Sequence, residues 1–404
     1  MPVTWLHISD LHVRADDSYD RAVVFRALLK SIKRFREHDE HSADFVLATG
    51  DIGFSGKAVE YMVVGDFFDQ LLEAAALSRR NLYVVPGNHD VDRTVGKQLL
   101  RQLSTRDEAD EYFHPNAPWL HLRHKMAPFL EWHNEYFRGI RTMPTNSTCG
   151  PVELLVKGHT RIGLLPINTA LFCQDDHDHE RLCIGRRCID SAVAQLNSLA
   201  ADLKIAMMHH PVEELSTIER QQVRAALVDH LDVVLTGHLH EAGFVSVGMW
   251  SHRNLRCAAG ATYQTRDYPN SAYYATFDTD HITVFPIRYE DQPRETWTVD
   301  PSIFSHASRL EFTFSVPCPP GQVGFRILGP DKVVAPRDEP RTRLKVQKKI
   351  TAAIHAANAN AENKRLRRKE EAILEIAAAA EEDAIAKERP TRRRKTKGTK
   401  PAKK

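Results

Sequence analysis

The chain has 404 residues, a formal net charge of +2 and 42% hydrophobic residues, which suits one large folded domain with additional segments. It contains no run of 18 apolar residues and no basic segment followed by a short apolar one, so the sequence predicts neither a membrane span nor a signal peptide. Six cysteines are scattered without paired spacing. We therefore expect a reduced, cytoplasmic protein.

Short apolar runs rich in β-branched residues predict five buried strands. They cover Val3–Ile8, Phe45–Thr49, Leu82–Val85, residues 204–208 and Val233–Thr236. Apolar residues at spacings of three and four predict a helix over residues 19–35, and further helices are expected over 59–77 and 218–228. This alternation predicts an α/β sheet, which binds ligands in the loops at the carboxyl ends of its strands.

A polar segment follows each of these strands, so we expect the five segments to converge on one edge of the sheet. They are Asp10-Leu11-His12, Gly50-Asp51, Gly87-Asn88-His89-Asp90, His209-His210-Pro211 and Gly237-His238-Leu239-His240. Imidazole favours transition metals and carboxylate keeps a site suited to phosphate, so this set indicates divalent Mn, Fe or Zn. No cysteine falls in the segments, which argues against a structural zinc cage.

Seven side chains in these segments are candidate metal ligands, too many for one ion with an open position. They are Asp10, His12, Asp51, Asn88, His209, His238 and His240. Two ions that share a bridging carboxylate would use all seven, and such a pair clamps the attacking and leaving oxygens of a displacement at phosphorus.

The ordered set D-x-H, G-D, G-N-H-D, H-x-P and G-H-x-H resembles the calcineurin-like metallophosphoesterase superfamily. It looks most like the branch with cyclic-nucleotide phosphodiesterases and the SbcD/Mre11 nucleases. The resemblance covers roughly residues 3–290. It implies a metallophosphoesterase-type β-sandwich flanked by helices (αββα).

The same resemblance implies a role for each motif residue. Asp10, His12 and His240 would hold one ion, Asn88, His209 and His238 the other, and Asp51 would bridge them. His89 matches the catalytic, non-ligand histidine that faces the substrate phosphate and protonates or stabilises the leaving oxygen. A hydroxide that bridges the ions would then attack phosphorus in line.

Two neighbours of these residues have less specific patterns. Asp90 is expected either to orient a ligand from outside or to cap a turn. His210 is expected to support a ligand from outside or to line the pocket, but the favoured interpretation is a partly buried histidine with a backbone partner. A separate zinc site at Cys183 and Cys188 with His177 and His179 is conceivable, but a solvated acidic loop over residues 175–180 is the favoured interpretation.

Three segments lie outside the core of residues 1–290. Residues 94–148 are predicted to form a helical insertion, either a cap that selects substrates or a segment whose aromatic residues pack on the sheet. Residues 291–340 are expected to form a small β extension. Residues 341–388 contain no glycine or proline and are rich in Ala, Lys, Glu and Arg, which predicts a long helix.

The charge is distributed unevenly along the chain. Residues 341–404 contain 20 Lys and Arg against 8 Asp and Glu, whereas residues 1–340 contain 35 against 45. The basic segment 389–404 is predicted to be disordered in isolation. It would either attach to nucleic acid or another polyanion or serve only as a solubilising tail.

Together these patterns predict a cytoplasmic, binuclear-metal phosphoesterase with a phosphoester substrate. The leading hypothesis is a phosphodiesterase acting on a nucleotide-type or other small phosphodiester. The alternatives are a DNA exonuclease or endonuclease, favoured by the basic tail and disfavoured by the acidic body, and a scaffold protein that uses the same fold. The sequence does not decide among the possible substrates or oligomeric states.

Overall fold

The computed structural model describes most of residues 1–304 and two later strands. The described residues are 1–304 apart from 17, 39–40, 100, 115–118, 175–177, 250–251 and 267–268, together with 310–313 and 325–327. The predicted helix 341–388 and the basic segment 389–404 lie outside the described residues. Among the helices of the described part, none is long and apolar enough to cross a membrane.

The first sheet has eight strands in the order β14-β13-β11-β10-β1-β2-β3, with β12 paired to β11. Their bounds are β1 Val3–Ile8, β2 Phe45–Thr49, β3 Leu82–Val85, β10 Ser271–Asp278, β11 His281–Glu290, β12 Thr296–Val299, β13 Leu310–Thr313 and β14 Phe325–Ile327. Strands β1, β2 and β3 pair in parallel, so their carboxyl ends lie together.

The second sheet has six strands in the order β4-β5-β6-β7-β9-β8. Their bounds are β4 Glu153–Lys157, β5 Thr160–Pro166, β6 Leu203–Met207, β7 Val233–Thr236, β8 Gly243–Met249 and β9 His252–Ala258. Strands β5, β6, β7 and β9 are parallel neighbours. The carboxyl ends of β6 and β7 therefore also share one edge.

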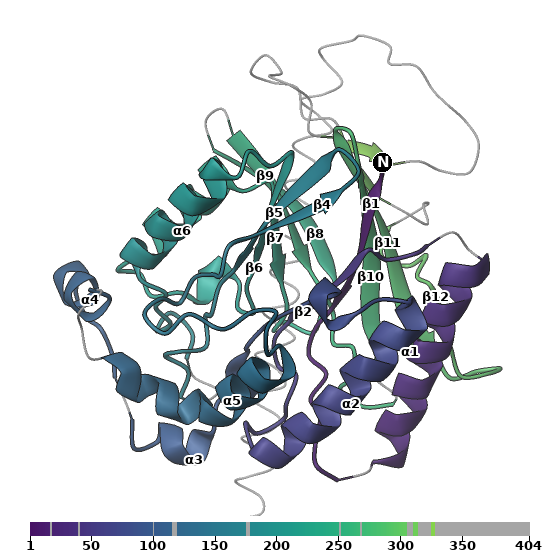
Figure 1. Cartoon of the computed structure of the whole chain (residues 1–404), viewed down its shortest axis with the longest axis horizontal. Helices are drawn as coiled ribbons and strands as arrows, with labels where there is room; N and C mark the ends of the chain where they lie inside the picture. The colour runs from purple at the N-terminus through teal and green to yellow at the C-terminus, as the bar shows by residue number, and fades with distance from the viewer. Residues whose placement is uncertain are drawn as a thin grey trace, which may run out of the picture. The chain divides into compact units, whose positions relative to one another are not determined.

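Helices cover the outer faces of the two sheets, with α1 and α2 on one side and α6 on the other (Figure 1). The α-helices are α1 Tyr19–His38, α2 Ala58–Ala75, α3 Arg93–Gly96, α4 Arg106–Tyr112, α5 Ala127–Tyr136, α6 Arg186–Ser198 and α7 Arg220–His230. Short 3-10 helices are η1 Arg79–Asn81, η2 Asn88–Asp90, η3 Trp119–Met126 and η4 Val212–Glu214.

Strand β1 shows why the predicted runs are apolar throughout. Leu6 and Ile8 pack in a core cluster with residues of α1 and α2, whereas Val3 and Trp5 pack in another with residues of the second sheet such as Met207. Successive side chains of a strand point to opposite faces, and here both faces are covered. The layers are therefore helix, sheet, sheet and helix.

This architecture confirms the αββα sandwich implied by the family resemblance. Four of the five predicted strands have the predicted bounds, and β6 is shifted by one residue. Helices α1, α2 and α7 lie where the periodicity placed them. The expectation of a single sheet was wrong, because β1, β2 and β3 belong to one sheet and β6 and β7 to the other. An uninterrupted apolar run indicates that both faces of a strand are buried, but it does not indicate to which sheet the strand belongs.

Candidate metal centre

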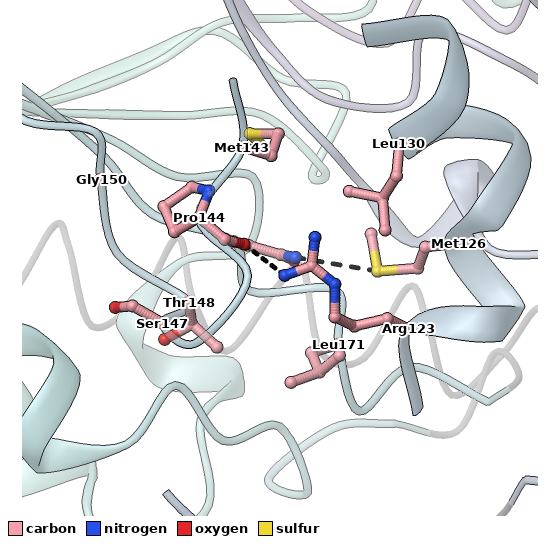
Figure 2. A pocket seen from close by; sticks show the side chains of 10 residues that line it. Arg123, Met126, Leu130, Met143, Pro144, Ser147, Thr148, Gly150 and Leu171 are labelled. Carbon is pink, nitrogen blue, oxygen red and sulfur yellow. Dashed lines mark hydrogen bonds between the residues drawn. The ribbon is translucent and has the colours of Figure 1, made fainter. Parts of the chain in front are cut away.

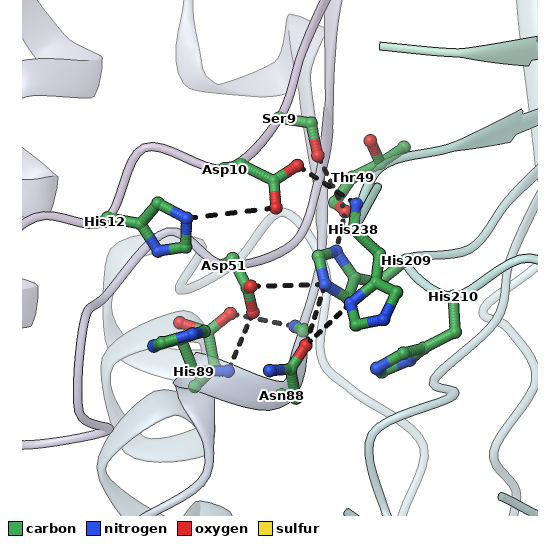
Figure 3. A network of polar contacts seen from close by, with 12 residues as sticks. Ser9, Asp10, His12, Thr49, Asp51, Asn88, His89, His209, His210 and His238 are labelled. Carbon is green, nitrogen blue, oxygen red and sulfur yellow. Dashed lines mark hydrogen bonds and ion pairs between the residues drawn. The ribbon is translucent and has the colours of Figure 1, made fainter. Parts of the chain in front are cut away.

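The five polar segments meet where the carboxyl ends of strands from both sheets face each other, and most of the residues involved are drawn in Figure 3. Four groups there place three potential donor atoms within 4.8 Å of one another. The groups are Asp10, His12 and His240; Asp10, Asp51 and His209; His12, Asp51 and His89; and His209, His210 and His238. Side chains separated by more than two hundred residues thus share one site.

Five of the seven predicted ligands have left-handed backbone conformations. Their φ values are 55° for Asp10, 45° for His12, 51° for Asp51, 72° for His238 and 58° for His240. Such conformations cost about 1–3 kcal/mol each for residues other than glycine, and they persist only where the surroundings enforce them. Hydrogen bonds between the loops do so: Asp10 N–H donates to Gly50 O at 3.0 Å, and His12 N–H donates to Asp51 O at 2.9 Å.

The glycines that precede the ligands provide the space that the ligands occupy. A Cβ atom on Gly87 would lie 2.1 Å from Asp51 Oδ1, and one on Gly237 would lie 1.9 Å from Ser9 Oγ and 2.7 Å from Asp10 Oδ2. Neither position tolerates a side chain without displacing the carboxylate loops. This close approach is the physical reason for glycine in the third and fifth motifs.

The first set of donors, here called the Asp10 group, consists of Asp10, His12 and His240. His240 Nε2 lies 3.2 Å from both Asp10 Oδ1 and His12 Nε2, and the latter two atoms are 4.0 Å apart. Tetrahedral zinc ligands with bonds of about 2.0–2.1 Å lie about 3.3 Å from one another. Asp10 Oδ1 is also buried without a hydrogen bond among the described residues. The Asp10 group therefore fits a metal ion.

The second set, here called the Asn88 group, consists of Asn88, His209 and His238. Asn88 Oδ1 lies 3.1 Å from both His209 Nε2 and His238 Nδ1. Asp51 Oδ2 lies 3.3 Å from His209 Nε2. These separations again match those between ligands of one ion. Asp51 is also within reach of Asp10 and His12, so its carboxylate lies between the two groups.

The buried histidines of the centre differ in protonation, and His209 has to release a proton before it binds a metal ion. Although burial opposes its charge, the neighbouring His209 holds the pKa of Asp51 well below its usual range. Burial also opposes charging of His209, but Asp51 and Asp10 raise the pKa of His209 to about 9. Burial lowers the pKa of His12 and of His238 to about 4. Those two rings are neutral at pH 7, the form that binds metals.

His89 contacts the centre in a different manner from the donor groups. Its backbone N–H donates to Asp51 Oδ1 at 2.7 Å, and its Nδ1 donates to the carbonyl of Phe54 at 2.7 Å. Its ring centroid is 4.7 Å from that of His12. Because Nδ1 is engaged by a carbonyl, Nε2 remains to act on a substrate. The proximity to Asp51 and His12 also makes His89 a possible donor by geometry alone.

Asp90 joins the Asp51 loop to the Asn88 loop. Its carboxylate accepts the backbone N–H of Gly53 and Gly87, each at 2.9 Å, and the hydroxyl of Tyr61 at 3.0 Å. Burial raises the pKa of Asp90 to about 7. Both interpretations from the sequence thus describe part of its geometry, since Asp90 caps the turn and positions two motif loops.

His210 differs from the partly buried histidine with a backbone partner that was expected. It is fully buried, and its Nδ1 lies 2.7 Å from the hydroxyl of Thr169. Its Nε2 lies 3.7 Å from Cys173 Sγ. The expectation was wrong because the loop after β5 supplies side-chain partners that the local sequence does not indicate. Burial lowers the pKa of His210 well below its usual range.

Several residues that support the centre were missed in the sequence. The carbonyl of Thr49 accepts a hydrogen bond from His209 Nδ1 at 2.6 Å, and Gln264 Oε1 lies 3.1 Å from His240 Nδ1. Ligand histidines commonly have such partners for the second ring nitrogen. Thr49 immediately precedes a motif, which is a usable signal. Gln264 has no comparable signal in the sequence.

The described aromatic residues of the insertion 94–148 mainly pack in the core. Phe129 and Phe137 belong to the cluster beneath α1 and α2, and Tyr112 and Phe113 belong to the cluster beneath the second sheet. A cavity beside Arg123 and other residues has a volume of about 10 Å³, room for about one water molecule (Figure 2). That cavity does not accommodate a substrate. A cap role for the insertion stays a prediction.

None of the described cysteines belongs to a group of potential metal donors. Cys149, Cys173, Cys183, Cys188 and Cys257 are free and buried. Within the described residues, no group of potential metal donors includes Cys183 or Cys188, although His177 lies outside that part. Figure 3 shows a cluster built from histidine, aspartate and asparagine instead.

Comparison with known proteins agrees with this geometry. The metallophosphoesterase-like protein YydB of Bacillus subtilis (strain 168) is 27% identical over 252 residues, which make up 60% of this chain and 50% of YydB. The chain thus spans half the length of that relative.

Two solved structures are also similar. PhoD has a TM-score of 0.50 at 10% identity, covering 78% of this chain and 70% of its own, which shows the fold alone. A dimetal phosphatase from Danio rerio has a TM-score of 0.44 at 11% identity, covering 74% and 98%. The model of the calcineurin-like phosphoesterases matches residues 3–242, more than half of the chain. The chain therefore belongs to the calcineurin-like phosphoesterase family, whose members hydrolyse phosphoesters with the help of metal ions.

Proposed function

We propose that the protein is a binuclear-metal phosphodiesterase that acts on a nucleotide-type or other small phosphodiester. The observation that carries this proposal is the position of Asp51. Its carboxylate lies between the Asp10 group and the Asn88 group and accepts the N–H of His89. One carboxylate shared by two sets of neutral and anionic donors is the arrangement required for two ions close together.

In this proposal the Asp10 group and the Asn88 group each hold one divalent ion, and Asp51 bridges the two. Six of the seven donors named for the pair are carboxylates or imidazoles, and the four imidazoles favour Mn, Fe or Zn over Ca and Mg. When bound, the ions would activate water as a nucleophile and neutralise charge at phosphorus. The protein contributes the fixed positions of the donors and the exclusion of bulk water from Asp10 and His209, which are fully buried.

His89 is proposed to act on the leaving oxygen. Its Nδ1 proton is committed to the carbonyl of Phe54, so the ring is held in one orientation with Nε2 available. To donate a proton or a hydrogen bond from Nε2 to the oxygen that departs from phosphorus, the ring must carry a second proton, because the proton on Nδ1 is used by the carbonyl. The hydrogen bond from its backbone to Asp51 keeps this ring beside the donors.

The exposure of the rim supports a phosphodiester as substrate. The side chain of His240 is 24% exposed, and Leu239 in the same motif is 54% exposed. A phosphodiester has an ester group on each side of phosphorus, so the site that receives it must be open beyond the metal donors. The family itself uses nearly the same donors for several phosphoesters, and the rim must select among them.

The direct test is hydrolysis of bis(p-nitrophenyl) phosphate and p-nitrophenyl phosphate by the purified chain after loading with Mn²⁺. We expect turnover of the diester to exceed that of the monoester, and full loss of turnover after chelation. Cyclic nucleotides and dinucleotides in the same assay then define the leaving group. Preference for the monoester would overturn the phosphodiesterase assignment and leave a metal-dependent phosphomonoesterase.

A DNA nuclease is the second candidate, and one observation favours it: nine basic residues and no acidic residue occur from Arg389 to the last residue. This segment lies outside the described residues, so its support is compositional. Removal of residues 389–404 should weaken DNA binding and reduce its salt dependence if DNA is the substrate. Equal DNA binding by the full and shortened chains, at several salt concentrations, would remove this candidate's support.

A scaffold role is the candidate from another class. Metal content distinguishes it from both enzymes, since about two ions per chain are expected for a binuclear site. No bound ion after loading with Mn²⁺ would favour the scaffold.

A further inference from the structure

The guanidinium group of Arg14 is held beside the centre by the aromatic ring of Phe54. Val13 forms a parallel bridge with Gly53, which aligns the segment after the first motif with the segment after the second. Arg14 and Phe54 follow these two residues, and the guanidinium carbon of Arg14 lies 3.6 Å from the centroid of the Phe54 ring. This separation is well within the range of a cation–π interaction.

Phe54 connects this cation to the centre. Its carbonyl holds His89 Nδ1, and its ring centroid lies 5.4 Å from the ring of His89 and 6.3 Å from that of His12. Phe54 itself is half-buried. The ring of Phe54 therefore contacts Arg14, the proposed leaving-group histidine and a metal donor.

The guanidinium of Arg14 is available to a ligand. Arg14 is exposed, and within the described part of the chain no carboxylate forms an ion pair with it. Its backbone is fixed, because the buried Arg21 donates from Nη2 to the carbonyls of Arg14, at 3.1 Å, and Asp16. One arginine thus orders the turn, and the other presents its charge at the rim.

We propose that Arg14, oriented by Phe54, forms an anion subsite that binds a second phosphate of the substrate. The inference rests on the proposed phosphodiesterase function and narrows its substrate class to phosphodiesters whose nucleoside carries a further phosphate. Stacking on Phe54 holds the guanidinium plane, and the N–H groups at its edge can bind a phosphate through two parallel hydrogen bonds. The two ions that the metal donors would hold then act on the scissile phosphate alone.

Two matched substrates test the subsite: the p-nitrophenyl ester of thymidine 5′-phosphate and the same ester with an additional 3′-phosphate. Hydrolysis of either adds water across the phosphorus–oxygen bond and releases p-nitrophenol. We expect kcat/KM to be about tenfold higher for the 3′-phosphorylated ester, the scale of one charge-assisted contact at an exposed site. Arg14→Gln should remove that preference and leave kcat/KM for the other ester unchanged.

Binding gives a readout that does not depend on turnover. Titration calorimetry of the Mn²⁺-loaded protein should show thymidine 3′,5′-bisphosphate binding about tenfold more tightly than thymidine 5′-phosphate, and Arg14→Gln should abolish the difference. Phe54→Leu keeps the carbonyl that holds His89 and should reduce the difference partly. Arg138→Gln is the matched control, since that arginine is 76% exposed and pairs with Glu135 away from the centre.

The outcomes separate the subsite from the proposed function. Hydrolysis of neither ester by the wild-type protein would overturn the phosphodiesterase assignment itself. Hydrolysis of both without a preference, or a preference that survives in Arg14→Gln, would overturn the subsite alone. Equal losses for both esters in Arg14→Gln would place the guanidinium at the scissile phosphate and also contradict the subsite.

Discussion

His209 and His240 are both candidate donors, but the second nitrogen of each ring has a different kind of partner. His209 Nδ1 donates to the backbone carbonyl of Thr49, in the fully buried strand β2. His240 Nδ1 lies 3.1 Å from the side-chain oxygen of Gln264, which is exposed. Backbone within a sheet holds its position more rigidly than an exposed side chain does.

The Asn88 group has the more rigid support, but the Asp10 group has the greater negative charge. The Asp10 group contains a carboxylate, whereas the Asn88 group consists of an amide and two imidazoles and has no carboxylate of its own. Cation binding by the Asp10 group thus depends more on charge, and cation binding by the Asn88 group depends more on the fixed positions of its donors. Asp51 is the one residue that serves both, and a hydrogen bond from His238 N–H to Asp10 Oδ2, at 3.2 Å, links them further.

The largest effect is expected from Asp51→Asn. The variant keeps the shape of the side chain but removes the charge shared by both groups, so we expect kcat to fall by about 10³-fold, which corresponds to about 4 kcal/mol. Elemental analysis should also find fewer than two ions per chain. Asp66→Asn, at an exposed position of α2, is the control. Near-normal activity and metal content in Asp51→Asn would show that the groups do not share this carboxylate.

His89→Ala should lower kcat by about 10²–10³-fold, the range for a positioned proton donor, and leave two ions bound. The loss should be greater for a dinucleotide than for bis(p-nitrophenyl) phosphate, because p-nitrophenolate departs without much help from an acid. Loss of one ion in this variant would instead make His89 a ligand, as its distance to Asp51 and His12 allows.

Most of the fold was predictable because its strands are buried on both faces. Leu6 and Trp5 are both fully buried although they point in opposite directions, which makes the strand an uninterrupted apolar run that sequence reveals. The division into two sheets was not predictable from these runs. Pairing between strands depends on partners distant in sequence, and periodicity within one strand carries no information about them.

The candidate site divides in the same way. The motif residues follow strands directly, so their meeting at one place could be inferred from the order of elements. Gln264 and Thr169 lie in loops distant from the motifs, and only the folded chain brings them to His240 and His210. Arg14 lies two residues after His12 of the first motif, but its contact with Phe54 depends on the bridge between Val13 and Gly53.

Gln264→Ala tests the difference between the two groups directly. Removing the amide takes away one hydrogen-bond partner of His240 Nδ1. We therefore expect one ion to bind about tenfold more weakly and the other to bind as before, which is the usual effect of losing a hydrogen-bond partner of a metal ligand. Competition with a chelator resolves the two affinities. Gln70→Ala, at an exposed position of α2, serves as the matched control. Equal weakening of both ions would mean that the two groups respond as one unit.

The smallest effect is expected from Thr169→Val, which acts beneath the Asn88 group. The variant keeps the branched shape but removes the hydroxyl that lies 2.7 Å from His210 Nδ1 and accepts the backbone N–H of His210 at 3.2 Å. The free energy of unfolding should therefore fall by about 1–2 kcal/mol. Urea unfolding of metal-free protein measures this loss, with Thr298→Val in β12 as the control.

Because burial keeps His210 neutral, either of its ring nitrogens can carry the proton. In Thr169→Val the proton can move to Nε2, which lies 3.7 Å from Cys173 Sγ, a weak acceptor. The backbone N–H of His210 then accounts for most of the loss of stability, and we expect metal affinity close to that of the wild-type protein. A large loss of metal affinity with unchanged stability would contradict this assignment, because it would place His210 among the ligands of the Asn88 group.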